Sequence, residues 1–252
     1  MIGTLSNIFR HPIKSIGAEA ISSASLTEGR ALPLDRVWGV LHEGSKIEAH
    51  AGRTDWARKM NFLVGVSAPD LMAVTHETLE NQFCLRHPAK PEICFNPETP
   101  EGQAAFLAWI SDLWPEHRPR PTVLAKAKDQ PLTDQSTPVL SLIGTASLRE
   151  VSEACGCDLD MRRFRANLWV SDWAPMYEQT LIGQRLRMGE AELEVVEPVG
   201  RCRAPDGNPA TGERDQDLLK LLKDQYGHTN LGVFVRVTKS GEIATGSTIE
   251  VI

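Results

Sequence analysis

The chain lacks the features that mark general nucleic-acid binding, membrane insertion or export. Its 252 residues carry a formal charge of −6, so it has no basic surplus for neutralising a phosphate backbone, although a small local basic pocket remains compatible. No apolar run approaches membrane-spanning length, and the N-terminus alternates like a strand instead of following the signal-peptide pattern. We therefore expect no nucleic-acid partner, no membrane span and no export.

Cysteine is scarce, and no regular spacing connects the five that are present. An odd number of scattered cysteines indicates a reducing compartment, a cytoplasmic location and no disulfide framework. Cys155-Gly156-Cys157 lacks the two-residue gap of zinc knuckles and thioredoxin-like sites, so we predict a helix end there, with Gly156 as its stop. The cysteines are Cys84, Cys94, Cys155, Cys157 and Cys202.

Short alternating segments bounded by Gly, Pro, Asp and Ser predict many short strands. Because short strands bury their edges best by closing, we expect a mainly β (α+β) fold containing a barrel. We divide it into an N-terminal β domain, residues 1–95, packed on a barrel domain, residues 96–252. The predicted strands cover residues 2–10, 18–26, 36–42, 61–66, 82–86, 167–170, 184–188, 191–197, 231–238 and 248–252.

Three short helices interrupt the strands. Thr99 is a suitable cap for the first, Pro100 fits its first turn, and Pro115 ends it. Ser147-Leu148-Arg149-Glu150 matches a capping box and predicts a second helix that ends at Gly156. The third is expected over residues 215–226, with Gly227 as its terminator, while the proline-rich stretch 116–138 reads as strand and crossing loops.

Cys202 has the most distinctive surroundings for chemistry. Arg201 and Arg203 flank it, and nearby prolines and glycines exclude regular structure. Neighbouring guanidinium groups favour the thiolate, which is a soft-metal ligand or a nucleophile. A half-buried structural cysteine beside two solvated arginines is the simpler interpretation of the triplet alone.

Other polar segments favour a functional site at Cys202 over this structural interpretation. Residues 10–15, Asp35-Arg36, residues 162–167 and residues 200–202 all place cationic or polar groups where loops are expected. Taken together, they can form a pocket for an anionic cofactor, with arginine forks on phosphate and a thiolate on a metal.

These segments resemble the ordered motifs of the MOSC family, named for the C-terminal domain of molybdenum cofactor sulfurase. The resemblance is nearest to its two-part members, which are similar to the mitochondrial amidoxime-reducing component. The matching segments are Arg10-His11-Pro12-Ile13-Lys14-Ser15, Leu34-Asp35-Arg36-Val37-Trp38, Arg163-Phe164-Arg165-Ala166-Asn167, Arg201-Cys202 with Asn208-Pro209-Ala210-Thr211-Gly212, and the closing strands from Tyr226 to Gly246.

The resemblance implies a molybdenum cofactor of the molybdopterin type, held between the N-terminal β domain and the barrel. Cys202 would be the metal ligand and the catalytic residue. Residues expected to hold the pterin and its phosphate are Lys14, Ser15, Arg36, Arg165, Asn167 and Arg201, with Ser136 or Thr137 adding hydroxyl contacts.

The chain departs from the family pattern at several places. Ala166 replaces a proline, residues 203–207 lack threonines, Ser247 replaces an aspartate, and residues 134–138 are shifted in spacing by one residue. The shift makes Ser136 and Thr137 the weakest assignments.

The implied function is an oxidoreductase that reduces N-hydroxylated or N-oxygenated small molecules. Asp206 or His228 could relay protons, although a solvent-exposed loop residue is the simpler interpretation of each. The sequence has no four-cysteine iron–sulfur cluster, so a separate protein must donate electrons. The alternatives are a sulfur carrier with a Cys202 persulfide, a non-catalytic cofactor-binding protein, and a β domain without a cofactor.

Overall fold

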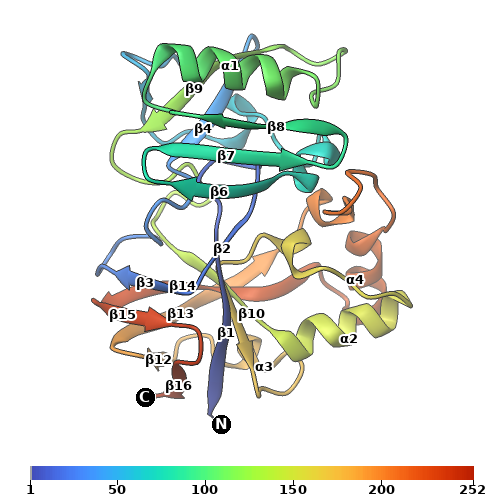
Figure 1. Cartoon of the computed structure of the whole chain (residues 1–252). Coiled ribbons are helices and arrows are strands. Elements are labelled where there is room, and N and C mark those ends of the chain that lie inside the picture. Colours follow the sequence, from blue (N-terminus) through green and yellow to red (C-terminus); the bar gives the residue numbers. More distant parts are fainter. Residues whose placement is uncertain (1) are drawn as a thin grey trace.

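The computed structural model describes residues 2–252 and is mainly β with short helices, as the sequence predicts. Seven strands form a closed barrel in the order β11-β10-β14-β13-β12-β16-β1, because β1 also pairs with β11, and β2 extends the sheet beside β1. Figure 1 shows the barrel in its lower half. The strands are β1 (Gly3–Arg10), β2 (Glu19–Ile21), β10 (Leu140–Gly144), β11 (Leu168–Ser171), β12 (Arg185–Met188), β13 (Ala191–Gly200), β14 (Asn230–Lys239) and β16 (Thr248–Val251).

Alternation along these strands fills the barrel interior. In β13, Ala191, Leu193 and Val195 are buried and partly exposed residues separate them. In β1, a register shift between Leu5 and Asn7 makes Leu5 and Ile8 the buried pair. Each of the larger buried side chains, such as Leu5, Ile8 and Leu193, contributes about 1.5–3 kcal/mol to the free energy of unfolding, so the shared core holds the barrel closed.

A second part of the molecule lies above the barrel in Figure 1. It contains two three-stranded sheets, and α1 (Pro100–Ser111) packs against β8 and β9. Phe106 and Ile110 of α1 join Trp38 and Leu124 in one buried cluster. The strands are β4 (Trp38–His42), β5 (Arg53–Thr54) and β9 (Pro121–Ala127) in one sheet, and β6 (Thr75–Leu79), β7 (Gln82–His87) and β8 (Lys90–Phe95) in the other.

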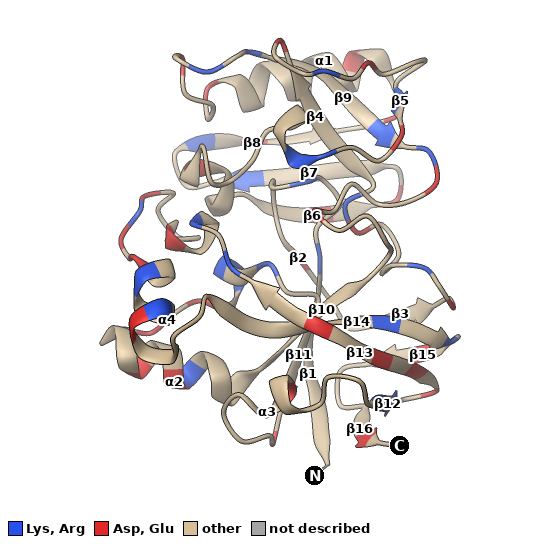
Figure 2. Ribbon diagram, turned by 180° about the vertical axis from the view of Figure 1, so that it is seen from behind, with Lys and Arg blue, Asp and Glu red and all other residues tan. Residues whose placement is uncertain are grey.

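The boundary expected between residues 95 and 96 stays a prediction. In the structure, β1 and β2 belong to the barrel sheet, whereas α1 and β9 pack in the second part. A short separate ladder joins β3 (Ser23–Leu26) to β15 (Gly241–Ala244). Acidic and basic residues occur on both parts of the ribbon (Figure 2).

The helix signals are confirmed in large part. The Thr99 hydroxyl accepts a hydrogen bond from the Gly102 amide, and Gly156 and Gly227 end their helices with positive φ. The described residues contain four α-helices. They are α1, α2 (Thr145–Cys155), α3 (Tyr177–Thr180) and α4 (Leu218–Tyr226).

Two helix starts differ from the prediction. The second helix begins at Thr145, and Ser147 inside it donates to the Glu178 carboxylate at 2.8 Å, so the expected capping box is wrong. The third helix begins at Leu218 instead of residue 215, because the Asp217 side chain accepts from the Lys220 amide and caps it there.

Two strand predictions also fail. Residues 61–66 do not form a strand, because Asn61, Phe62 and Leu63 are buried consecutively after a 3₁₀ turn (Lys59–Asn61) and do not alternate. The expected strand 18–26 divides at Ser22 into β2 and β3, which join different sheets. Strands β5, β6, β8 and β10 were not predicted.

The expectation of no disulfide is wrong. Cys84 on β7 lies directly opposite Cys94 on β8, and the two sulfurs are bonded. The pairing was hidden because β8 was not predicted. Cysteine usage therefore gives no support to a reducing compartment. No helix within residues 2–252 has the length and apolar character needed to cross a bilayer.

Candidate functional site

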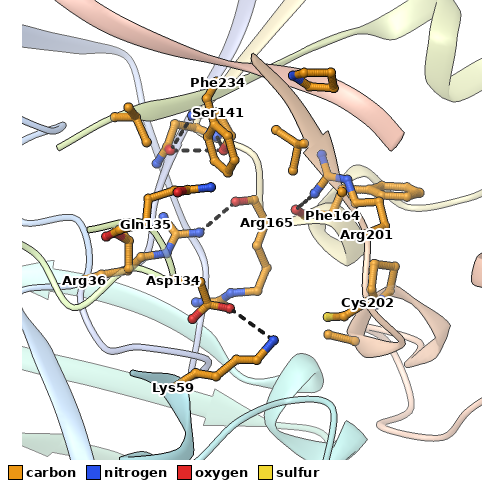
Figure 3. Close-up of a pocket in the computed structure, with 18 of the residues that line it drawn as sticks. Arg36, Lys59, Asp134, Gln135, Ser141, Phe164, Arg165, Arg201, Cys202 and Phe234 are labelled. Atoms are coloured by element: carbon orange, nitrogen blue, oxygen red, sulfur yellow. Dashed lines mark hydrogen bonds and ion pairs between the residues drawn. The ribbon is translucent and has the colours of Figure 1, made fainter. Parts of the chain in front are cut away.

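A cavity of about 460 Å³ brings together segments that are distant in the sequence. Six cationic side chains and two carboxylates line it, so its wall has an excess of positive charge. Figure 3 shows the Cys202 sulfur pointing into the space bordered by Arg165, Asp134 and Lys59. The ionic residues of the wall are Lys14, Arg36, Lys59, Asp134, Arg163, Arg165, Glu197 and Arg201.

The structure gathers most of the predicted site residues at this cavity. Those that line it are Lys14, Arg36, Arg165, Asn167, Arg201 and Cys202. Ser15 is half-buried with a φ of 63° and is not part of the lining. Ser136 and Thr137 are exposed and lie outside it, whereas Thr133, Asp134 and Gln135 of the same loop do line it. The shift of spacing in that segment fits this displacement.

Arg165 and Arg201 contact backbone carbonyls and no carboxylate within residues 2–252. Arg165 donates to the Gly17 carbonyl at 2.8 Å, and Arg201 donates to the carbonyls of Phe164, at 2.8 Å, and Leu231. Burial, together with the charge of nearby Arg36, lowers the pKa of Arg165 to about 9 and that of Arg201 to about 10. Both guanidinium groups stay protonated at neutral pH, so the wall keeps two charges that an anion can neutralise.

Arg36 is held by a buried network behind the cavity. It forms an ion pair with Asp35 and donates to the Arg165 carbonyl at 3.0 Å. Asp35 also lies 3.2 Å from the His11 ring, and burial lowers the pKa of His11 to about 3. Arg36 and Arg165 both adopt positive φ, 52° and 48°, an uncommon backbone state that a surrounding network must maintain.

Lys14 and Asp134 form the main ion pair inside the cavity. The Lys14 ammonium, buried to 4% exposure, donates to Asp134 at 2.6 Å and to the Leu132 carbonyl at 2.8 Å. Burial lowers the pKa of Lys14 despite this pairing. Burial alone would raise the pKa of Asp134, but the charges of Lys14 and Lys59 outweigh it and lower that pKa. Lys59 lies 3.7 Å from the other Asp134 oxygen.

The loop that carries Cys202 is anchored by Arg163. This arginine, 3% exposed, forms a two-pronged ion pair with Asp215 at 2.7 and 2.8 Å and donates to the carbonyls of Pro205 and Asp206. The Asp206 carboxylate is fully buried and accepts from Arg203 and from the Leu218 amide at the start of α4. The expectation that Asp206 is a solvent-exposed loop residue is therefore wrong. Cys202 itself is exposed and unbonded.

Asn167 lines the cavity, but its side-chain amide is already hydrogen-bonded within the protein. Its amide oxygen accepts from the Ser141 amide and hydroxyl, and its amide nitrogen donates to the Phe9 carbonyl at 3.2 Å. These bonds tie β11 to its neighbours β1 and β10. The contribution of Asn167 to ligand binding stays a prediction.

Sequence analysis missed several lining residues. Lys59 lies two residues before a segment expected to be a strand and follows no recognisable pattern. Asp134 and Arg163 lie inside the segments discussed above but were not assigned roles; the arginine-rich stretch 162–167 was the available signal for Arg163. His228 is exposed and does not line the cavity.

The cavity's potential metal ligands fit a metal that is coordinated mainly by its cofactor. Among the described residues, the one cluster of three possible metal-binding side chains is Cys84, Glu92 and Cys94, whose sulfurs are bonded to each other. The cavity therefore offers a single thiol beside cationic groups. That set suits an anionic, sulfur-bearing metal cofactor better than a bare divalent ion.

Sequence comparison finds relatives among the molybdenum cofactor sulfurases. The chain is 25% identical over 245 residues to the molybdenum cofactor sulfurase of Caenorhabditis elegans, an alignment covering 93% of this chain and 33% of that protein. The sulfurase of Caenorhabditis briggsae is 32% identical over 99 residues, 38% of this chain and 14% of that protein. The chain thus spans about a third or less of these relatives' length.

A structural comparison matches the YuaD protein of Bacillus subtilis with a TM-score of 0.47 and 14% identity, covering 100% of this chain and 96% of that one. Residues 2–111 match the MOSC N-terminal beta barrel domain, and residues 129–250 match the MOSC domain. The chain belongs to the MOSC family, in the form that carries both of these domains.

Proposed function

We propose that this chain binds a molybdenum cofactor in the cavity and reduces N-hydroxylated or N-oxygenated small molecules. The observation that carries the proposal is an exposed Cys202 thiol beside two guanidinium groups, Arg165 and Arg201, that have no carboxylate partner within residues 2–252. Membership of the MOSC family supports the choice of cofactor.

Under this proposal, different side chains of the cavity bind different parts of the cofactor. Cys202 would supply the protein's sulfur ligand to the metal. Arg165 and Arg201, with Lys14 and Arg36, would neutralise the phosphate and hold the pterin, because charge-assisted hydrogen bonds in a partly dry site are strong. The cofactor, when bound in its reduced form, would supply two electrons to the substrate and take up its oxygen atom.

Residues around Cys202 position its sulfur, and the hydrogen bonds of Asp206 exclude proton transfer by that carboxylate. Arg163 and Asp206 hold the loop that follows Cys202, through Pro205 and Arg203, while the thiol itself stays exposed. Both Asp206 oxygens are already hydrogen-bonded, so we assign Asp206 a positioning role and no proton transfer. Asp134 and Lys59 at the opening keep opposite charges next to the space where substrate would enter.

Electrons must come from outside the described chain under this proposal. Three cysteines of the described chain are free, and a four-cysteine iron–sulfur cluster cannot be built from them. The exposed position of Cys202 leaves the site open to solvent and to an external donor.

A second candidate function is sulfur transfer through a Cys202 persulfide. Two observations favour it: the thiol is exposed, and the relatives aligned with this chain are named molybdenum cofactor sulfurases. Guanidinium groups near the sulfur would stabilise the anionic persulfide as they would stabilise a thiolate.

Turnover of benzamidoxime with an artificial reductant tests the reductase. We expect protein from a host that makes molybdenum cofactor to form benzamidine, and Cys202→Ala to lose at least 100-fold in rate, because metal ligation would be lost. Cys157→Ala, assayed under reducing conditions, is the matched control and should keep its rate. No turnover, together with cyanide-labile sulfur on Cys202 and no metal, would replace the reductase with sulfur transfer.

A further inference from the structure

Cys155 and Cys157 form a second thiol site that the proposed function does not use. Cys155 is the last residue of α2, and Gly156 turns the chain with a φ of 72°. The Cys157 amide donates to the Ser152 carbonyl at 3.2 Å, which closes this turn. As a result, the two sulfurs lie 3.3 Å apart, and both side chains are half-buried and unbonded.

No metal-ligand set surrounds this pair. Within residues 2–252, no third histidine, cysteine or carboxylate atom lies close enough to complete a three-ligand cluster with the two sulfurs. The remaining polar partner is an amide, since the Cys155 thiol donates to the Gln216 side-chain oxygen at 2.8 Å. Two adjacent thiols with little else around them favour sulfur–sulfur chemistry over metal binding.

A short chain of contacts connects the pair to Cys202. Gln216, the partner of Cys155, follows Asp215, which forms the two-pronged ion pair with Arg163. Arg163 in turn donates to the carbonyls of Pro205 and Asp206 in the loop that carries Cys202. Residues 215–216 therefore contact both Arg163, which holds the Cys202 loop, and the end of α2. Their contact with α2 is the single hydrogen bond from the Cys155 thiol to Gln216.

We propose that Cys155 and Cys157 are a reversible dithiol–disulfide site, oxidised by glutathione disulfide, whose state alters the exposure of the Cys202 sulfur. The inference rests on these contacts and does not require a bound molybdenum cofactor.

The reaction is an ordinary thiol–disulfide exchange. The Cys157 thiolate attacks one sulfur of glutathione disulfide and displaces one glutathione thiolate. The Cys155 thiolate then attacks the Cys157 sulfur of the mixed disulfide and displaces the second. The protein loses two electrons and two protons, and two glutathione molecules are formed. Burial raises the pKa of Cys155 to about 11, so little Cys155 is thiolate at neutral pH and it acts in the second step.

Oxidation removes the proton that Cys155 gives to Gln216. The amide oxygen then has no donor from α2, and the adjacent Asp215 is held less firmly against Arg163. We expect the loop at Pro205 and Asp206 to open more often, so that Cys202 reacts faster with reagents in solution.

Peptide mass measurement tests the disulfide. The 252-residue chain, made in a host without molybdenum cofactor, is equilibrated in glutathione buffers and alkylated. Cleavage after Arg149 and Arg162 releases both thiols in one peptide with no other cysteine. We expect the doubly alkylated form of this peptide to give way, as the buffer becomes more oxidising, to an unalkylated form two hydrogens lighter than the dithiol, and to return with excess glutathione. A peptide that stays reduced, or carries only bound glutathione, would overturn the proposal.

The alkylation rate of Cys202 tests the coupling in the same protein. We expect a several-fold faster rate in the oxidised form. Gln216→Ala should show the fast rate while still reduced, since it removes the same hydrogen bond. Cys157→Ser, which cannot form the disulfide but keeps Cys155 and Gln216, should stay slow in every buffer. Equal Cys202 rates in the oxidised and reduced chains would refute the coupling, whatever cofactor the cavity binds.

Discussion

At the residue scale, the cavity depends on guanidinium charges that the protein leaves unpaired. Arg165 and Arg201 give their hydrogens to backbone carbonyls alone within the described chain, whereas Arg163 is paired with Asp215. An anion in the cavity therefore adds interactions without breaking an ion pair at either residue. Asp134 is different, because a ligand on Lys14 has to displace its carboxylate.

We predict that Arg165→Gln weakens binding of pyrophosphate, used as a phosphate probe, by about 10- to 100-fold, the equivalent of about 1.5–3 kcal/mol for a charged hydrogen bond. Isothermal titration calorimetry at fixed ionic strength measures the dissociation constant for pyrophosphate in the original chain and the variant. Arg236→Gln is the matched control, since Arg236 is half-exposed and pairs with Glu194 outside the cavity. Equal losses in the two variants would show that the effect is one of general charge.

Buried histidines predict a pH dependence of stability. Burial, with nearby Arg165 and Arg36, lowers the pKa of His11 to about 3, and burial lowers that of His76 to about 4. Between pH 6 and 5 the unfolded chain binds protons on these rings while the folded chain does not, so the free energy of unfolding falls as pH falls. Each histidine contributes a slope of about 1 kcal/mol per pH unit.

Urea unfolding at several pH values measures that slope. His11→Asn, whose amide can still donate to Asp35, should flatten it by the contribution of one proton, even where the variant is less stable overall. A slope identical to that of the original chain would mean that His11 titrates in the folded protein.

The sequence motifs predicted which cationic residues line the cavity better than they predicted the hydrogen bonds of those residues. Arg36, Arg165, Arg201 and Cys202 were expected at one site because their segments resemble the ordered motifs of the MOSC family, and all four line the cavity. Lys59 was not expected there, since it enters the cavity from a turn without a motif.

At the element scale, β14 passes very close to β10 beside Arg201. Gly232 has a φ of 78°, and a Cβ there would lie 2.5 Å from Ile143 Cγ1 and 2.6 Å from the Leu142 carbonyl oxygen. The same Cβ would lie 3.4 Å from Arg201 Nη2. A backbone oxygen cannot move aside, so this glycine fixes the approach of the two strands and the place of the guanidinium group.

We predict that Gly232→Ala lowers the free energy of unfolding by about 3 kcal/mol, the sum of overpacking and of an unfavourable positive φ. Gly227→Ala is the control, because Gly227 has a similar φ of 75° with no atom near the added Cβ. It should cost about 1–2 kcal/mol. Urea unfolding compares them, and equal losses would mean that the strands can separate at no cost.

Elements with local signals were predicted well, and elements defined by distant partners were not. Thr99, Gly156 and Gly227 act through hydrogen bonds within a few residues, which the sequence contains. Strands β6 and β8 depend on pairing with β7, and the Cys84–Cys94 bond depends on their register. The consecutive burial of Asn61, Phe62 and Leu63 comes from tertiary packing, which propensity does not report.

At the scale of the whole molecule, a chain of net charge −6 concentrates positive charge in one cavity. Its walls come from the β1–β2 connection, the β3–β4 connection, the turn at Lys59, the β9–β10 loop, the segment before β11 and the end of β13. Arg36 donates to the Arg165 carbonyl and Arg165 donates to the Gly17 carbonyl, so hydrogen bonds join three of these segments.

The order of motifs along the chain predicted this convergence, and the family match extends over both parts. The domain boundary stays a prediction, and the sequence did not indicate that β1 and β2 join the barrel sheet while β9 pairs with β4. Composition alone does not indicate which sheet each strand joins.

Molybdenum and pterin content of the purified chain is the measurement that tests the account most directly. From a host that makes the cofactor, we predict close to one molybdenum and one pterin per chain, with molybdenum lost in Cys202→Ala and kept in Cys157→Ala. A chain without molybdenum and pterin, or a Cys202→Ala variant that retains metal at the original level, would contradict the central claim.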